Sequence, residues 1–186
     1  MGTINANTMM TLNGVAGRPE NWQGDYMSPQ MTGLIAGALQ TCSGLVLGRR
    51  TYDEFVRYWP EVDPTENPMA PLMNGLPKYV VTTTMNTAEW TNTQVVSDTE
   101  ALARVKASTE GVLNIIGSPT LVRSLLEAGM VDELSLMVFP TVVNDGIPLF
   151  AGAETRTRLE LQHCSELPLG VLHLTYVAAG ALALSD

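Results

Sequence analysis

The order of helix-like and strand-like segments constrains the fold of this chain more than any single motif does. Up to Asp132, short apolar or β-branched runs alternate with stretches of helical spacing. After Asp132 the strand-like ranges are residues 133–143, 158–162 and 171–177, with turn-forming residues between them. Alternation favours parallel strands, whereas consecutive strands favour antiparallel pairing. We therefore expect an α/β fold with a mixed, mostly parallel central sheet, flanking helices and an antiparallel C-terminal hairpin.

Local signals mark the individual elements of this fold. The predicted strands of the front part span residues 4–12, 44–47, 78–83, 93–96 and 112–116. Helix starts are marked by Ser28 with Pro29, by Thr51 with Glu54 in a capping box before residues 52–58, and by Asp98 or Thr99. Gly129 is expected to end the helix that starts near Pro119, as a C-cap. Prolines from Pro60 to Pro77 predict a long loop.

Composition limits the classes of partner and the cellular location. The chain has 186 residues with 45% hydrophobic and 16% charged side chains, which fits one globular domain over residues 1–180 and a short tail at 181–186. A net charge of −9 argues against nucleic acid or an anionic membrane as the main partner. No apolar run approaches the ~18 residues of a membrane span. The first residues lack a secretory pattern, so we expect a cytoplasmic protein.

Cysteines and histidines give no sign of a metal or redox site. Cys42 and Cys164 are isolated in sequence, and we expect both to be buried thiols in a reducing compartment. His163 and His173 each stand alone on a predicted strand, where a core or surface role is more common than metal ligation. We expect no bound metal.

A strand-to-helix junction at Gly48, Arg49, Arg50 and Thr51 suggests an anion site. Free backbone N–H groups and the positive end of the helix dipole attract negative charge at such a junction. The two arginines add guanidinium groups that can bind phosphate with two hydrogen bonds each. The motif taken alone is equally consistent with a solvated basic turn.

Two other predicted strand ends carry similar residues. Gly117 permits close backbone approach, while Ser118 and Thr120 offer hydroxyls at a helix start, and a Cβ at Gly117 would point into a ligand or demand an unfavourable backbone angle. Residues 82–84 are three consecutive threonines. Each cluster alone is also ordinary turn chemistry. Because the carboxyl ends of parallel strands share one edge, the three clusters together suit an extended ligand with several phosphates, such as a dinucleotide. The Rossmann glycine fingerprint is absent.

These motifs together resemble the dihydrofolate reductase-like superfamily. The closer resemblance is to the reductase domain of bacterial riboflavin biosynthesis and to its stand-alone relatives. The matching segments cover nearly the whole chain: residues 11–17, 47–52, 80–84, 115–121, 125–134 and 139–150. The resemblance implies a reductase that transfers a hydride from NADPH to a C=N or C=O bond of a small polar substrate, with heterocycles among the candidates.

The resemblance also implies a set of site residues. The cofactor set is Met9, Ala16 and Gly17 at the nicotinamide carboxamide, Gly48, Arg49, Arg50 and Thr51 at the pyrophosphate and 2′-phosphate, Thr83 and Thr84 at the 2′-phosphate, and Gly117, Ser118, Thr120 and Leu121 over the pyrophosphate. We expect Asn7, Phe55 and Trp59 on the substrate side, with core packing as the alternative for the two aromatic residues. Asp25 is the candidate catalytic acid, and a solvated loop acid is its alternative.

Departures from the family pattern keep other functions open. Many relatives have two or three glycines where this chain has Gly117, Ser118 and Pro119, and Asn13 stands where an aspartate is frequent. The signature of the deaminase that accompanies the riboflavin reductase is absent. The alternatives are a non-catalytic ligand-binding member of the same fold, or a pyrimidine or pterin reductase of riboflavin or folate metabolism.

Apolar residues on both faces of the C-terminal strands predict a homodimer. Leu134, Leu136 and Val138 alternate with Met137 and Phe139, so the strand needs cover on each side. One chain has few helices left to provide that cover. The resemblance points the same way, because relatives in the family are commonly dimers.

Overall fold

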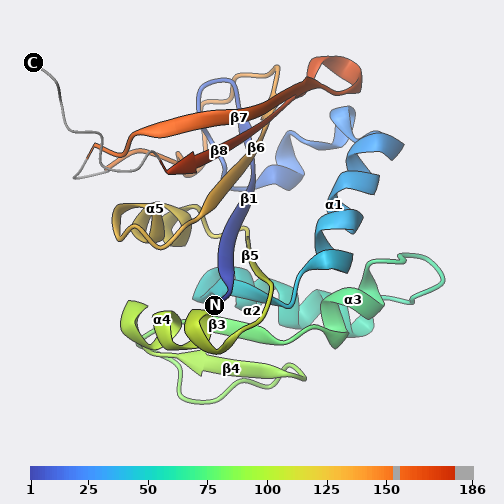
Figure 1. The fold of residues 1–186 in the computed structure, drawn as a ribbon. Helices are drawn as coiled ribbons and strands as arrows, with labels where there is room; N and C mark the ends of the chain where they lie inside the picture. The colour runs from blue at the N-terminus through green and yellow to red at the C-terminus, as the bar shows by residue number, and fades with distance from the viewer. Residues whose placement is uncertain (153–155, 179–186) are drawn as a thin grey trace, which may run out of the picture.

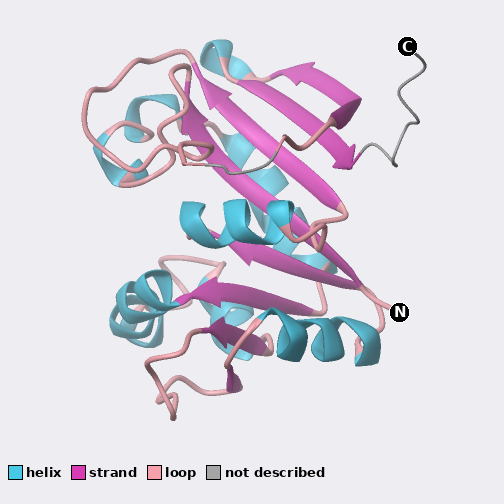
Figure 2. Cartoon of the chain, turned by 90° about the vertical axis from the view of Figure 1, so that its left-hand side faces the viewer, coloured by secondary structure: helices cyan, strands magenta, loops and turns pink. Residues whose placement is uncertain are grey.

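The computed structural model describes residues 1–152 and 156–178, which form one twisted sheet covered by helices on both faces (Figures 1 and 2). The predicted tail at 181–186 lies outside the described residues. The strands are β1 (Thr3–Thr11), β2 (Gly44–Gly48), β3 (Lys78–Val81), β4 (Thr93–Val96), β5 (Val112–Ile116), β6 (Glu133–Phe139), β7 (Leu159–Glu166) and β8 (Leu172–Ala178). The helices are α1 (Pro29–Thr41), α2 (Arg49–Tyr58), α3 (Ala70–Gly75), α4 (Thr99–Ser108) and α5 (Pro119–Glu127). Short 3₁₀ turns are η1 (Pro19–Asn21), η2 (Gly24–Tyr26), η3 (Trp59–Glu61) and η4 (Pro168–Gly170).

The sheet has the mixed topology expected from the order of the elements. Its strand order is β4-β3-β2-β5-β1-β6-β8-β7. The pairs from β4 through β6 are all parallel, and β8 pairs antiparallel with both β6 and β7. The predicted fold class is therefore confirmed. The carboxyl ends of β1, β2, β3 and β5 consequently share one edge of the sheet.

Three apolar clusters fix the helices on this sheet. On one face, α4 and α5 pack through Leu102, Val122 and Leu125 against β1, β5 and β6. On the other, α1, α2 and α3 meet β2 and β3 around Tyr52 and Met73. A third cluster joins the start of α1 to the end of β6. Figure 1 shows α1 and α3 on the opposite side of the sheet from α4 and α5. None of the described helices is long and apolar enough to cross a membrane.

Several local predictions are confirmed. The Ser28 hydroxyl accepts a hydrogen bond from Met31 N at the start of α1, and Asp98 accepts one from Ala101 N at the start of α4. That backbone N–H lowers the pKa of Asp98 from its ordinary value. Gly129, at φ +65°, ends α5 as predicted.

Four predictions about local structure are wrong. Helix α2 begins at Arg49 with Gly48 as its N-cap, so Thr51 lies inside the first turn and forms no capping box. The strand predicted over residues 133–143 ends at Phe139, before a proline that cannot donate to the ladder. The proline-rich loop contains α3, because Pro71 stands in its first turn, where a proline needs no donor. Cys164 is exposed, although Cys42 is buried as expected.

Candidate cofactor site

The N-termini of α2 and α5 meet at the carboxyl edge of the sheet. The Ser118 hydroxyl accepts a hydrogen bond from Gly48 N at 2.9 Å and lies 2.6 Å from the Thr51 hydroxyl oxygen. A Cβ added to Gly48 would lie 2.5 Å from the Ser118 Oγ, so only glycine allows this approach. The sequence clusters at Gly48–Thr51 and Gly117–Leu121 therefore lie next to each other at this edge.

Left-handed backbone at Gly117 and Ser118 turns the chain from β5 into α5. Their φ angles are +64° and +51°, an unusual conformation for serine. The unfavourable backbone angle predicted for a side chain at Gly117 is confirmed. A Cβ there would meet the Thr51 side chain at 3.0 Å. Of the two predicted alternatives for a Cβ at Gly117, the structure thus supports the backbone angle, and the added atom would also contact α2.

Both of these helices lack the side-chain cap that α1 and α4 possess. No side chain accepts from the first-turn N–H groups of α2, whose N-cap is Gly48, or of α5, whose N-cap is Ser118. The Ser118 hydroxyl is directed at Gly48 and Thr51 instead. Two helix N-termini with free N–H groups and aligned dipoles lie side by side, which is an arrangement that attracts a polyanion.

The sheet is open beside this pair of helices. Strand β5 ends at Ile116, opposite Asn7, whereas β1 continues to Thr11 alongside β6. After Asn7, β1 therefore has no strand partner on its β5 side. Thr8 lies in this part of β1 with only 7% of its surface exposed, and its hydroxyl has no hydrogen-bond partner among the described residues. A buried polar group without a partner is the kind of feature that a bound ligand satisfies.

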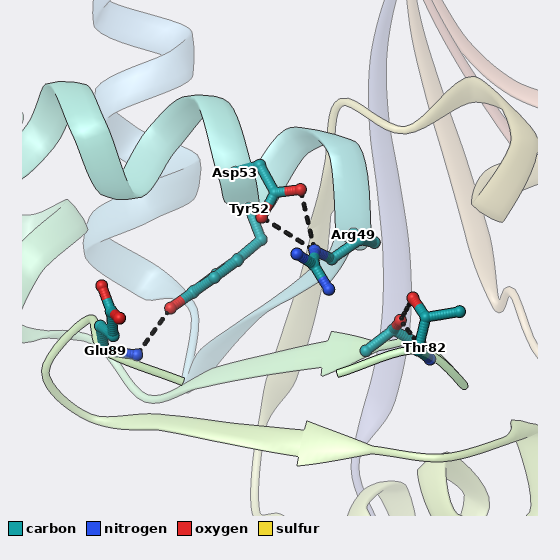
Figure 3. Close-up of polar contacts among 6 residues, drawn as sticks. Arg49, Tyr52, Asp53, Thr82 and Glu89 are labelled. Atoms are coloured by element: carbon teal, nitrogen blue, oxygen red, sulfur yellow. Dashed lines mark hydrogen bonds and ion pairs between the residues drawn. The ribbon is translucent and has the colours of Figure 1, made fainter. Parts of the chain in front are cut away.

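The two arginines of the junction differ in their surroundings. The Arg49 Nε donates to both carboxylate oxygens of Asp53 at 2.8 Å, as Figure 3 shows. Arg50 is exposed, and no ion pair within residues 1–152 and 156–178 involves it. One guanidinium is thus held in place, while the other is available to a ligand.

The threonines after β3 also divide into engaged and available residues. Thr84 N donates to the Thr82 hydroxyl, and the hydroxyls of Thr82 and Thr84 lie 3.2 Å apart. Thr83 is exposed, with no hydrogen bond in the described part of the chain. A groove of about 680 Å³ starts at Thr82 and Thr83 and follows α4 as far as Ser108.

The predicted nicotinamide contacts lie in two places. Met9 is near the carboxyl end of β1, and Ala16 and Gly17 are in the loop that follows this strand. Ala16 N and Gly17 N both donate to the Ile147 carbonyl, at 2.9 and 3.0 Å. These amides are therefore engaged, so a ligand can meet Ala16 and Gly17 only through other atoms. Met9 is half-buried and lies on the open stretch of β1. Thr120 is exposed and Leu121 half-buried in the first turn of α5.

The predicted substrate residues are not brought into one cluster. The Asn7 amide donates to Asn114 Oδ1 at 3.1 Å, and the Asn114 amide donates to the Ala38 carbonyl of α1. Phe55 and Trp59 are half-buried, with ring centroids 6.1 Å apart, and pack against the α1–α2–α3 core. Their core alternative therefore has direct support. Trp59 Nε1 is nevertheless a buried donor without a partner in the described structure.

Asp25 lies away from Asn7, one of the predicted substrate residues. It is exposed on η2, before the start of α1. Asn7 is connected through Asn114 to Ala38, which is nine residues into that helix and roughly 14 Å along its axis. The solvated-acid alternative for Asp25 fits this position.

Sequence reasoning missed three features of this region. Asp53 follows Arg49 by four residues, a helical pair spacing that could have been recognised. Thr8 continues the alternation of buried positions that begins with Ile4 and Ala6, which marks it as a buried polar group.

The third missed feature is a polar contact across β6, β7 and β8. The Ser135 hydroxyl lies 2.9 Å from His173 Nε2, and the rings of His163 and His173 are 6.0 Å apart. The two histidines thus do not stand alone, because strand pairing joins positions ten residues apart. Burial lowers the pKa of His173, and the nearby His163 lowers it further. No three His, Cys, Asp or Glu side chains of the described residues are placed to hold a metal.

The sheet order and the helix layers are those of the dihydrofolate reductase-like fold. The sequence model of the RibD C-terminal domain matches residues 2–173. The chain belongs to this family.

Solved structures with the same fold include proteins of reductase type. A protein from Shewanella sp. PV-4 ascribed to riboflavin biosynthesis superposes with a TM-score of 0.75 at 20% identity, over 96% of this chain and 99% of that one. A pyrimidine reductase-like protein from Corynebacterium diphtheriae gives a TM-score of 0.66 at 18% identity, over 96% and 92%. The dihydrofolate reductase of Enterococcus faecalis, solved with NADP(H) and RAB-propyl, gives 0.64 at 19% identity, over 96% and 97%.

One curated relative matches by sequence. The uncharacterized protein YyaP of Bacillus subtilis (strain 168) is 26% identical over 138 residues, which are 71% of this chain and 72% of that protein.

Proposed function

We propose that this protein is an NADPH-dependent reductase acting on a C=N or C=O bond of a small polar substrate. The observation that carries the proposal is the pair of uncapped helix N-termini, α2 and α5, beside the open stretch of β1. Free N–H groups of two helices suit a pyrophosphate, because it presents two adjacent anionic groups. The Enterococcus faecalis enzyme of the same fold was solved with NADP(H), which supports this choice of ligand.

The order of the anchors along the sheet edge sets the direction of the cofactor. Thr83 and the groove along α4 lie at the ends of β3 and β4, and suit the adenosine. The junctions at Gly48 and Gly117 lie at the ends of β2 and β5, and suit the pyrophosphate. The open stretch of β1 with Met9 comes next, and suits the nicotinamide. The unpartnered Thr8 hydroxyl supports a polar ligand atom at this position.

The chain's own part in the reaction is to bind, orient and shield the reactants. NADPH supplies the hydride when it is bound. Residues at the edge fix the cofactor by its phosphates, and the face of β1 toward α1 receives the substrate. Asn7 is held there by Asn114, and the unpartnered Trp59 Nε1 offers a hydrogen bond to a polar substrate atom. Asp25 stays a candidate for proton delivery only if a ligand draws η2 inward.

Cofactor binding tests this proposal without knowledge of the substrate. NADPH and NADH are titrated at fixed ionic strength against the wild type, Arg49→Ala and Arg50→Ala. We expect the wild type to bind NADPH more tightly than NADH. In at least one variant, the ratio of the NADPH affinity to the NADH affinity is expected to fall about tenfold or more, because a charge-assisted hydrogen bond contributes roughly 1.5–3 kcal/mol. Arg57→Ala, on the exposed last turn of α2, is the control for the loss of one positive charge. Equal narrowing in all three variants contradicts a specific phosphate contact.

A second candidate function is ligand binding without turnover in the same fold. The exposed position of Asp25, with no hydrogen bond to Asn7 among the described residues, favours it. A panel of imines, carbonyl compounds, pyrimidines and pterins separates the two functions. Oxidation of NADPH at 340 nm with any of them supports the reductase, and tight NADPH binding without oxidation supports the second function.

A further inference from the structure

Asp53 holds one of the two arginines at the cofactor edge. Both of its carboxylate oxygens accept from the Arg49 Nε at 2.8 Å, one helical turn from the start of α2. The side chains are 41% and 39% exposed, so the pair is half-buried and only partly screened by solvent. Asp53 therefore offsets much of the charge that Arg49 brings to this edge.

The geometry leaves the rest of the guanidinium available. The contact with Asp53 uses Nε, so the two terminal nitrogens of Arg49 stay free of Asp53. Figure 3 shows the guanidinium between α2 and β3, with Asp53 on the helix side and Thr82 at the end of β3. A phosphate at this position would meet Arg49 and, within the same few ångströms, the negative charge of Asp53.

We propose that Asp53 limits the preference of this site for a 2′-phosphorylated cofactor over an unphosphorylated one. The inference rests on the proposed function, because it assigns the adenosine end to this edge. Asp53 acts in two ways: it neutralises the Arg49 charge, and it repels a 2′-phosphate dianion directly. A ribose with a free 2′-hydroxyl escapes that repulsion. The chain therefore accepts NADH better than Arg49 and Arg50 alone would allow.

Adenosine fragments test the inference directly. The probes are 2′,5′-ADP and 5′-ADP, which differ only in the 2′-phosphate, titrated by calorimetry against wild type and Asp53→Asn. We expect Asp53→Asn to bind 2′,5′-ADP about three- to tenfold more tightly, with 5′-ADP changed less than about twofold. The gain in affinity is expected to shrink in 0.5 M salt, because the Debye length there is on the order of 4 Å and salt screens the repulsion between Asp53 and the phosphate.

A neighbouring acid supplies the matched control. Glu54→Gln removes the same charge from the next residue of α2, which is exposed and makes no contact with Arg49. If Glu54→Gln raises the affinity for 2′,5′-ADP as much as Asp53→Asn does, the effect comes from net charge alone and the proposal is overturned. Asp53→Ser is the second variant, with the same expected direction, and thermal melting checks that each variant is folded.

A double-mutant cycle with Arg49 separates the possible outcomes. In the Arg49→Ala background, Asp53→Asn is expected to lose part of its gain for 2′,5′-ADP, because the part that passes through the guanidinium is removed while the direct repulsion remains. A fall in 2′,5′-ADP affinity in Asp53→Asn overturns the proposal, because Asp53 would then be orienting Arg49 for the phosphate. A wild type that binds neither probe nor NADPH overturns the proposed function itself, and a wild type that binds both probes with unchanged variants overturns this inference alone.

Discussion

Lys78 is a buried cation whose surroundings allow a quantitative prediction. The residue is fully buried at the start of β3. Its Nζ donates to the carbonyls of Met73, Asn74 and Leu76 at 3.0, 3.0 and 2.8 Å, and lies 4.4 Å from the centre of the Trp90 ring. These carbonyls belong to the end of α3, where a cation also meets the negative end of the helix dipole.

Burial lowers the pKa of Lys78 from 10.5 to about 8. At about 1.36 kcal/mol per pKa unit, this difference corresponds to about 3 kcal/mol of penalty on the charged form. The unfolded chain therefore binds this proton more tightly than the folded chain does. The free energy of unfolding is unaffected below pH 8, rises as the pH goes from about 8 to about 10.5, and is level above that.

Substitution by methionine isolates this contribution, because Lys78→Met keeps the volume and removes the charge. At pH 7 we expect a net loss of stability of about 1 kcal/mol. The variant leaves three carbonyls at the end of α3 without their ammonium donor, and the loss of such a buried partner costs on the order of 1–3 kcal/mol. At pH 10.5 the wild type no longer carries the penalty of a buried charge, so the difference between the two proteins is expected to widen to about 4 kcal/mol.

Urea unfolding of both proteins between pH 7 and 10.5 checks the prediction. Groups that are common to both proteins cancel in the difference. A difference that stays constant with pH would show that the carbonyls and the Trp90 ring fully compensate the burial of the charge. If the difference in unfolding free energy becomes smaller as the pH rises, the pKa of Lys78 is raised in the folded protein and the prediction is wrong.

Three further predictions concern the turn, the assembly and the histidine pair. Gly117→Ala is expected to destabilise the apo protein by about 1–3 kcal/mol, because positive φ and the Thr51 contact both oppose a Cβ; an unchanged apo melting temperature contradicts this. We expect a homodimer, and light scattering from a ~20 kDa particle at micromolar concentration rules it out. His163→Gln is expected to raise the pKa of His173 in an NMR titration, because it removes a neighbouring positive charge; an unchanged pKa leaves burial as the only cause.

Much of the fold was predictable because its signals are local. The strands at Thr93–Val96 and Val112–Ile116 have the predicted bounds. β-branched runs and flanking turn residues specify such short strands without reference to the rest of the chain. The caps at Ser28 and Asp98 are equally local, since each side chain bonds to an N–H three residues later.

Other elements depend on partners that are distant in sequence. Thr51 matches a capping box, but its hydroxyl is used by Ser118, 67 residues away, and the helix starts two residues earlier. Helix α3 tolerates Pro71 in its first turn, and Lys78, which lies outside the helix, donates to three carbonyls at its end. No short sequence window contains these contacts. Local patterns therefore predict a capping box at Thr51 and a loop where α3 forms.

The candidate site shows the same division. Glycines, hydroxyls and arginines at strand ends identified the edge of the sheet, because those residue types are rare in buried strands. Which arginine is available follows from the i,i+4 spacing only once α2 is known to begin at Arg49, and which threonine is available depends on the turn after β3. Asp53 engages Arg49 and leaves Arg50 exposed, and Thr82 engages Thr84 and leaves Thr83.

The absence of caps on α2 and α5 links stability to function. A side-chain cap contributes about 1 kcal/mol to a helix, and α1 and α4 both have one. At α2 and α5 the N-cap residues are Gly48 and Ser118, and the serine hydroxyl instead ties the two helices together. This contact fixes the spacing of the helix ends while leaving their first-turn N–H groups free. An anion that accepts hydrogen bonds from both helix ends therefore caps two helices at once. Its binding is expected to raise the free energy of unfolding, because it supplies the caps that the apo protein lacks there.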